Sequence, residues 1–173
     1  MHGVDEFCEV YFEDVVIPGD RMLGKPGDGW QLAMDLLPYE RSTCFWQRIA
    51  YLYARFDRLI AEAVDEDDPI ADLDVGSAYL ALHTLRCRSR STQHRLADGA
   101  RLGPETSIDK VLLATAEQRL YDTVHDLLPG AIELDDTPWR TEFLYSRAAT
   151  IYGGTAEIQR NIIARRLLDL GKE

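Results

Sequence analysis

The chain has 173 residues, 46% of them hydrophobic, which is enough to form one domain with a buried core. Its formal net charge of -11 disfavours nucleic acid as a partner, because contacts with phosphates need a positive field. The sequence contains no run of about 18 apolar residues and no signal-peptide pattern, so we expect a soluble, cytoplasmic protein without a membrane partner.

A β-strand pattern opens the chain. Residues 7–17 are rich in β-branched and aromatic side chains and end at Pro18-Gly19, which is typical of one or two strands. A strand pair of this length is only marginally stable alone, so the rest of its sheet is expected to lie elsewhere. We therefore expect residues 1–27 to form the last strands of such a sheet with a linker, and residues 28–173 to form a helical domain.

Four helices are predicted after the linker, because apolar side chains recur there at spacings of three and four, and Pro or Gly residues separate the segments. Their expected ranges are residues 30–64, 68–98, 104–128 and 139–170. Helices of this length joined by short loops predict an all-α fold, an antiparallel up-down four-helix bundle with a short β-strand remnant at the N-terminus.

The last predicted helix is interrupted by Gly153 and Gly154, after which Thr155 can cap a new helix. The first turn of a helix leaves backbone N–H groups without partners inside the helix. Such an end, with a hydroxyl beside it, suits a polar or anionic group of a large ligand.

Metal and disulfide sites are not expected. A di-metal site in a helical bundle would need Glu-x-x-His pairs, and the sequence has none. Its four histidines are scattered, and its three cysteines lack the C-x-x-C spacing of a zinc site.

Glu40 interrupts a mostly apolar helix face. If it were buried there, the carboxylate would hold its proton more tightly, which suits a general base that works near neutrality. The alternative is a structural Glu40 at the edge of the bundle, paired with a base and solvated with the help of Arg41. The residues on the same side of a helical wheel are Ala33, Leu36, Leu37, Cys44 and Gln47.

Three separated stretches together resemble the acyl-CoA dehydrogenase family. Residues 9–30 resemble the exit from that family's middle β-domain, and Glu40-Arg41 resembles a Glu-Arg pair near the start of the next helix. Residues 151–160, Ile-Tyr-Gly-Gly-Thr-Ala-Glu-Ile-Gln-Arg, resemble the family's C-terminal signature. The resemblance spans nearly the whole chain.

The resemblance implies a flavoprotein oxidoreductase of fatty acid or lipid metabolism that uses FAD and an acyl-CoA thioester. In this family a glutamate removes the α-proton while the β-hydrogen leaves as a hydride to the flavin. Many members carry that glutamate directly after the signature Tyr, where this chain has Gly153. Other members carry it at the position that matches Glu40, so the resemblance makes Glu40 the candidate base. Arg41, Tyr152 and Gly153 are then expected to line the substrate.

The same resemblance assigns FAD contacts to Gly154, Thr155 and Glu157. At Glu157 the family has a Gln, and the change replaces a possible donor with an anion. The resemblance also implies a homo- or hetero-oligomer, either a dimer or a tetramer, and an electron-transfer acceptor in the full enzyme.

Several departures from the family pattern indicate an enzyme that is incomplete as an isolated chain. Two motifs that hold FAD across a subunit interface are absent, Arg-x-x-Phe-Gly near residues 63–74 and Gln-x-x-Gly-Gly near residues 127–131. The family's N-terminal helical domain and most of its β-domain are also absent. Relatives built from two bacterial subunits share the Gly-Gly signature and often lose one flavin half-site. A non-catalytic oligomerisation subunit and an unrelated helical interaction module therefore remain alternatives.

Overall fold

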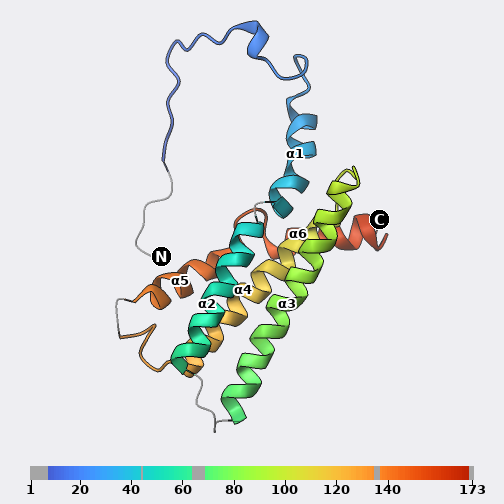
Figure 1. Cartoon of the computed structure of the whole chain (residues 1–173). Helices are drawn as coiled ribbons and strands as arrows, with labels where there is room; N and C mark the ends of the chain where they lie inside the picture. The colour runs from blue at the N-terminus through green and yellow to red at the C-terminus, as the bar shows by residue number, and fades with distance from the viewer. Residues whose placement is uncertain (1–7, 44, 64–68, 135–136, 172–173) are drawn as a thin grey trace.

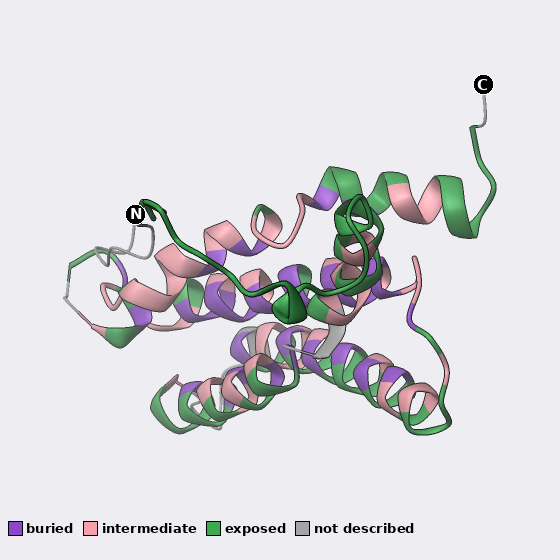
Figure 2. Ribbon diagram, turned by 90° about the horizontal axis from the view of Figure 1, so that it is seen from above, coloured by how far each residue is buried: buried purple, intermediate pink, exposed green. Residues whose placement is uncertain are grey.

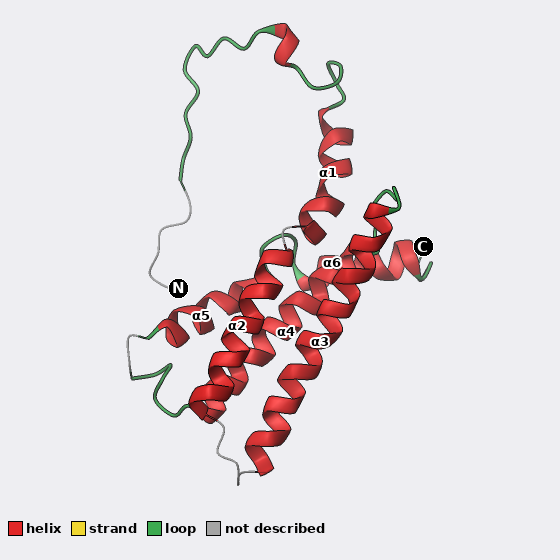
Figure 3. Cartoon of the chain, in the orientation of Figure 1, coloured by secondary structure: helices red, strands yellow, loops and turns green. Residues whose placement is uncertain are grey.

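The computed structural model describes residues 8–43, 45–63, 69–134 and 137–171, and within these ranges the chain is helical and contains no β-strand (Figures 1 and 3). A short 3-10 turn, η1 (Gly19–Arg21), precedes α1 (Gly29–Thr43). Helices α2 (Phe45–Ala63), α3 (Pro69–Ala97) and α4 (Thr106–Leu127) follow. The chain then forms α5 (Pro138–Ser146), the 3-10 turn η2 (Arg147–Thr150), α6 (Ala156–Ile162) and the π-helical turn η3 (Ile163–Leu167).

The all-α prediction is therefore confirmed, whereas the strand expected within residues 7–17 is not formed in the described part of that segment. Its apolar side chains, including Val10, Tyr11 and Phe12, are exposed to solvent. The physical reason is the one that makes short strand pairs marginal, since a strand needs neighbouring strands that pair with its backbone. Figure 1 shows this segment extended away from the helices.

The predicted first and last helices are each divided. α1 ends at Thr43 and α2 starts at Phe45, and Figure 1 shows α1 pointing away from the packed helices. The last segment ends as an α-helix at Ser146 and continues as a 3-10 turn before the Gly pair, so α5 and α6 are separate. The second and third predicted helices correspond to α3 and α4. The four-helix bundle is thus not confirmed, although the break at Gly153 and Gly154 lies where the sequence indicated it.

Helix α4 lies at the centre of the molecule and contacts α1, α2, α3, α5 and α6. The apolar stripe predicted for α2 is buried against it, and Figure 2 shows the buried faces of the long helices turned toward one another. The α2 stripe consists of Phe45, Ile49, Leu52, Phe56 and Leu59. No helix within the described ranges is long and apolar enough to cross a membrane.

Candidate active site

Gly153 and Gly154 form a left-handed turn between η2 and α6. Their φ angles are +63° and +94°, a region that favours glycine because a Cβ would crowd the backbone. The side-chain amide of Gln159 spans the turn, and its Nε2 donates to the carbonyl oxygens of Gly153 at 3.1 Å and Gly154 at 3.4 Å. The predicted N-cap is confirmed, since Oγ1 of Thr155 accepts a hydrogen bond from the backbone N–H of Ile158 at 3.3 Å.

The structure brings Glu40 to this turn from α1. A Cβ built on Gly153 would lie 3.6 Å from Oε1 of Glu40 and 3.2 Å from Cε of Lys110. The Glu40 carboxylate thus occupies the neighbourhood into which a side chain at position 153 would project. Glu40 itself is exposed to solvent in this chain, so the burial that the apolar helix face indicated is not found.

Lys110 of α4 lies beneath the turn, next to Gly153 and Tyr152. Its side chain is 2% exposed, and its ammonium group donates a hydrogen bond to the carbonyl oxygen of Ala149. The same nitrogen lies 4.5 Å from the centre of the Tyr152 ring, which is a cation–π contact. Burial lowers the pKa of Lys110, and the negative charges of Glu117 and Glu40 act in the opposite direction.

Sequence reasoning missed Lys110, although a signal was present. Lys110 and Glu117 fall on the same stripe of α4 as Leu113, Leu120 and Val124, which are all buried. A charged residue at a core position of an amphipathic helix needs a partner, because an unpaired charge is costly to remove from water. That spacing could have singled out Lys110.

Tyr152 lines the same turn. Its side chain is partly buried, and its ring lies 6.1 Å from that of Tyr145 between centroids. Burial raises the pKa of the Tyr152 phenol, and the nearby charge of Glu117 acts in the same direction. Tyr152 therefore presents a neutral phenol at physiological pH.

Arg41, which follows Glu40 on α1, lies near the second glycine of the turn. Its Nη2 lies 4.0 Å from the position of a Cβ on Gly154, and its buried Nε has no hydrogen-bond partner in the part of the chain that the structure describes. Oε1 of the fully buried Gln159 also lacks a partner within the described residues. Unsatisfied buried polar atoms are uncommon in folded proteins, and they mark a position where a ligand could supply the missing hydrogen bonds.

A cavity of about 490 Å³ extends from Arg41 between α1, the α3–α4 loop and the C-terminal turns. Two further arginines, Arg101 and Arg166, line it, and Asp35 is the acidic residue among the lining side chains. Three guanidinium groups around one cavity favour an anionic ligand, because arginine binds phosphate and carboxylate oxygens through paired N–H donors.

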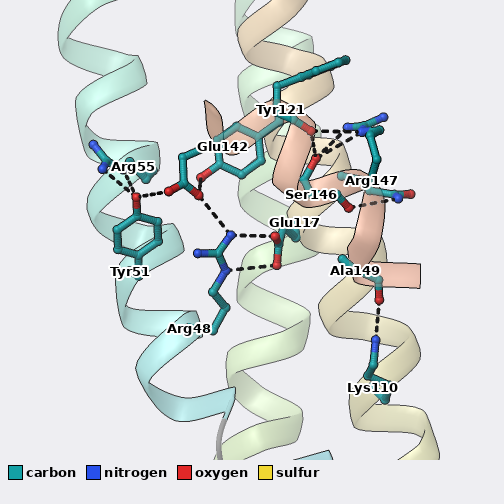
Figure 4. Close-up of polar contacts among 12 residues, drawn as sticks. Arg48, Tyr51, Arg55, Lys110, Glu117, Tyr121, Glu142, Ser146, Arg147 and Ala149 are labelled. Atoms are coloured by element: carbon teal, nitrogen blue, oxygen red, sulfur yellow. Dashed lines mark hydrogen bonds and ion pairs between the residues drawn. The ribbon is translucent and has the colours of Figure 1, made fainter. Parts of the chain in front are cut away.

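A network of buried and partly buried polar side chains joins the helices that carry this site (Figure 4). Arg48 of α2 binds Glu117 of α4 at 2.7 Å and Glu142 of α5 at 3.1 Å. Tyr51 and Tyr121 donate their hydroxyl groups to Glu142 at 2.6 and 3.1 Å. Because α5 runs into η2 and the Gly turn, this network fixes the position from which the turn starts.

The structure therefore gathers most of the residues predicted for the site. Glu40, Tyr152 and Gly153 lie around Lys110, and Arg41 lies beside Gly154. The other two predicted residues are at the start of α6, where Thr155 is the N-cap and Glu157 is exposed.

Comparison with known proteins gives a family for this arrangement. Residues 27–168 match the family model described as Acyl-CoA dehydrogenase, C-terminal domain. Acyl-CoA dehydrogenase IpdE1 of Mycobacterium tuberculosis is 34% identical over 180 residues, which covers 99% of this chain and 46% of that protein. Acyl-CoA dehydrogenase IpdE1 of Mycolicibacterium smegmatis is 33% identical over 182 residues, covering 100% of this chain and 45% of that protein.

A similar fold is found among solved structures. Butyryl-CoA dehydrogenase from Megasphaera elsdenii superposes with a TM-score of 0.78 at 19% identity, over 91% of this chain and 43% of that one. At this identity the likeness shows the fold alone. The chain spans a little less than half the length of the curated relatives named above.

Proposed function

Because the chain belongs to the acyl-CoA dehydrogenase family, through the C-terminal domain, we propose that it is the helical part of an enzyme that dehydrogenates an acyl-CoA thioester between its α and β carbons. In this proposal residues 28–173 form the helical domain, and Glu40 is the base. The observation that carries the proposal is the position of the Glu40 carboxylate beside Gly153. The two positions from which members of the family supply the base converge here on one place, and only Glu40 has a side chain that can take a proton.

The proposed chemistry of this chain is a proton transfer to one carboxylate oxygen of Glu40 from the α-carbon of the thioester. A positioned carboxylate of this kind contributes about 10²–10⁴-fold to a rate. Because residue 153 has no side chain, the Glu40 carboxylate and the Lys110 methylene lie in the room above it, and the partly buried ring of Tyr152 is next to them in the turn. Arg41, beside the turn, has N–H groups that can donate to the substrate.

FAD is the cofactor that the family uses, and the start of α6 fits a polar edge of such a group. Oγ1 of Thr155 already accepts the Ile158 N–H, so its hydroxyl hydrogen can be donated outward. At Gly154 the Gln159 amide fills the place of a side chain, so residue 154 can offer a ligand its backbone groups, whereas the exposed carboxylate of Glu157 is limited to accepting hydrogen bonds. When bound, the flavin accepts the hydride that leaves the β-carbon.

The arginine-lined cavity supports an anionic cosubstrate. Arg41, Arg101 and Arg166 would neutralise phosphate groups of a CoA ester or of FAD, both of which carry several negative charges. This cavity is adjacent to the turn through Arg41, so a ligand with a long polar tail can reach both places.

The enzyme that we propose is an assembly rather than this chain alone. Large apolar side chains along residues 10–36 are exposed, which is typical of surface that a partner covers. We therefore propose a homo- or hetero-oligomer in which other segments supply the rest of the flavin and substrate sites, with an electron-transfer acceptor that reoxidises the flavin.

The test is anaerobic bleaching of the flavin by acyl-CoA esters in the complete assembly. Glu40→Gln keeps the size of the side chain and removes the base, and we expect it to slow bleaching by about 10²–10⁴-fold. Glu133→Gln, a change at an exposed glutamate, is the matched control and should bleach at the wild-type rate.

Wild-type bleaching in Glu40→Gln would refute the base assignment. That result would favour the second candidate function, a non-catalytic subunit that contributes a helical interface. The departures at residues 63–74 and 127–131 are the observations on which this second candidate rests.

A further inference from the structure

Lys110 is buried at the centre of the proposed site, and its hydrogen bond goes to a backbone carbonyl rather than to a carboxylate. The ammonium group donates to the Ala149 oxygen and lies against the Tyr152 ring. Removing an ammonium from water is costly, so a lysine in such a place needs nearby negative charge to remain protonated.

Charged and titratable groups lie near Lys110 on α1, on α4 itself and in the turn after η2. Glu40 faces it from α1, and Glu117 belongs to the same helix, α4. Tyr152 faces it from the turn after η2. Arg48 of α2 affects Lys110 indirectly, because it forms an ion pair with Glu117.

Glu117 is already engaged by a strong partner. Nη2 and Nε of Arg48 lie 2.7 and 3.2 Å from its two oxygens, a two-point hydrogen-bonded ion pair. The charge of Glu117 is therefore largely compensated by Arg48. Glu40, whose Oε1 and the Cε of Lys110 approach the same point above Gly153, is the second acidic group that acts on Lys110.

We propose that Lys110 is a positioning residue for the Glu40 base: it holds the turn through Ala149 and Tyr152 and draws the Glu40 carboxylate to the space above Gly153. This inference rests on the proposed function and deepens it. Gly153 belongs to the same arrangement. A Cβ at this position would lie 3.2 Å from Cε of Lys110, and residues with a side chain rarely adopt its backbone conformation. The lysine methylene and the carboxylate thus occupy the room that the absent side chain leaves.

The proposal predicts the pH dependence of flavin bleaching in the complete assembly. A cation near a carboxylate favours its ionised form. Loss of the cation therefore moves the acid limb, the part of the pH–rate profile in which the rate falls as the pH is lowered, to higher pH. Lys110→Met keeps the unbranched chain and removes the charge. We expect the rate of Lys110→Met to begin its fall at higher pH than that of the wild type, with bleaching about 3- to 10-fold slower on the acid side.

Lys110→Arg is the matched control because it keeps the charge. Its acid limb should stay at the wild-type pH even if the maximal rate falls. A purely structural lysine would lower the rate of Lys110→Met by the same factor at every pH, and that result, or an unshifted limb, would overturn the proposal.

A second measurement needs no variant of Lys110. In assemblies labelled with 13Cε-lysine, the NMR titration of Lys110 should show a lower pKa in Glu40→Gln than in the wild type, because Glu40 raises that pKa. An unchanged titration of Lys110 would overturn the proposal even where Lys110→Met fails to fold.

The two proposals fail in different ways. Wild-type bleaching in Glu40→Gln rejects Glu40 as the base, whatever the lysine does. An inactive Glu40→Gln combined with an unshifted acid limb in Lys110→Met leaves the base assignment standing and rejects Lys110 as its positioning residue.

Discussion

Arg48 and Glu117 form an ion pair across the interface of α2 and α4, with Nη2 of Arg48 2.7 Å from Oε1 of Glu117. The Glu117 side chain is fully buried, whereas 21% of the Arg48 side chain is exposed. Arg48 also contacts Glu142 of α5, and its guanidinium group lies over the rings of Tyr51 and Tyr145. One arginine therefore joins three helices and supplies the counter-charge of a carboxylate that water does not reach.

Arg48→Met should lower the free energy of unfolding by about 3–5 kcal/mol, because it leaves the Glu117 charge buried without its partner. Urea denaturation measures this change. Arg58→Met is the matched control, since Arg58 pairs with Glu62 at the surface, where 43% and 36% of the two side chains are exposed. The control should cost about 1 kcal/mol or less. Equal decreases in the free energy of unfolding of the two variants would show that the buried ion pair contributes no more than the surface pair.

Gly154→Ala should destabilise the protein by about 2–3 kcal/mol. The alanine would have to keep the positive φ of this position, which is unfavourable for it, and its Cβ would displace the hydrogen-bonding amide of Gln159. The Cβ would lie 2.4 Å from Nε2 of Gln159, which donates to the carbonyl oxygens of the turn. Thermal unfolding provides the measurement.

Gly76→Ala is the control for the preceding change. Gly76 lies within α3, and a Cβ there meets no atom within 4 Å. Alanine favours helix more than glycine does, so this variant should gain about 0.5–1 kcal/mol. A destabilised Gly76→Ala, or a neutral Gly154→Ala, would contradict the geometry of these two positions.

His125 should titrate above its ordinary value. The hydrogen bond with Asp126 raises the pKa of His125, and burial lowers it. The charge of Glu133, whose Oε1 lies 2.6 Å from Nε2 of His125, raises this pKa further. A raised pKa in the folded state means that the stabilisation is fully present below about pH 6.5 and is lost as the pH rises through the folded pKa. NMR titration of the imidazole checks the direction. In Glu133→Gln the pKa of His125 should fall, and an unchanged value would reject the Glu133 contact.

Thr155→Ala should cost about 1 kcal/mol of stability, because it removes the acceptor for the Ile158 N–H at the start of α6. Thr155→Ser keeps the oxygen and should remain close to the wild type. Chemical denaturation of the two variants distinguishes the cap from the methyl group, and an Ala variant as stable as the Ser variant would show that the cap contributes nothing.

Local sequence pattern was sufficient for the parts of the fold that depend on near neighbours. The apolar stripe from Phe45 to Leu59 predicted α2 and its buried face, because helix periodicity is a property of residues three and four apart. The N-cap at Thr155 was predicted for the same reason, since the cap and its partner are three residues apart. Pattern did not reveal that α1 and α2 run in different directions (Figure 1), since the helical signal is strong in both segments.

The features that sequence missed depend on residues distant along the chain. The sequence shows Lys110 on the apolar stripe of α4, but not that α1 and the turn after η2 lie around it. The resemblance to a family singled out Glu40 and Gly153 separately, but their approach is set by the packing of α1 on α4. The expected strand was wrong in its described part because strand formation depends on partners that local pattern does not supply.

The three buried charges of α4 have a consequence for how the bundle assembles. Asp109, Lys110 and Glu117 bind, respectively, Arg88 on α3, a carbonyl of η2, and Arg48 on α2. Apolar contacts tolerate sliding and rotation, but a shift of α4 by one turn would separate all three charges from their partners at once. Each stranded charge costs several kcal/mol, so misaligned packings with the same apolar burial are rejected. The buried polar contacts of α4 thus fix its position relative to the neighbouring helices, independently of any ligand.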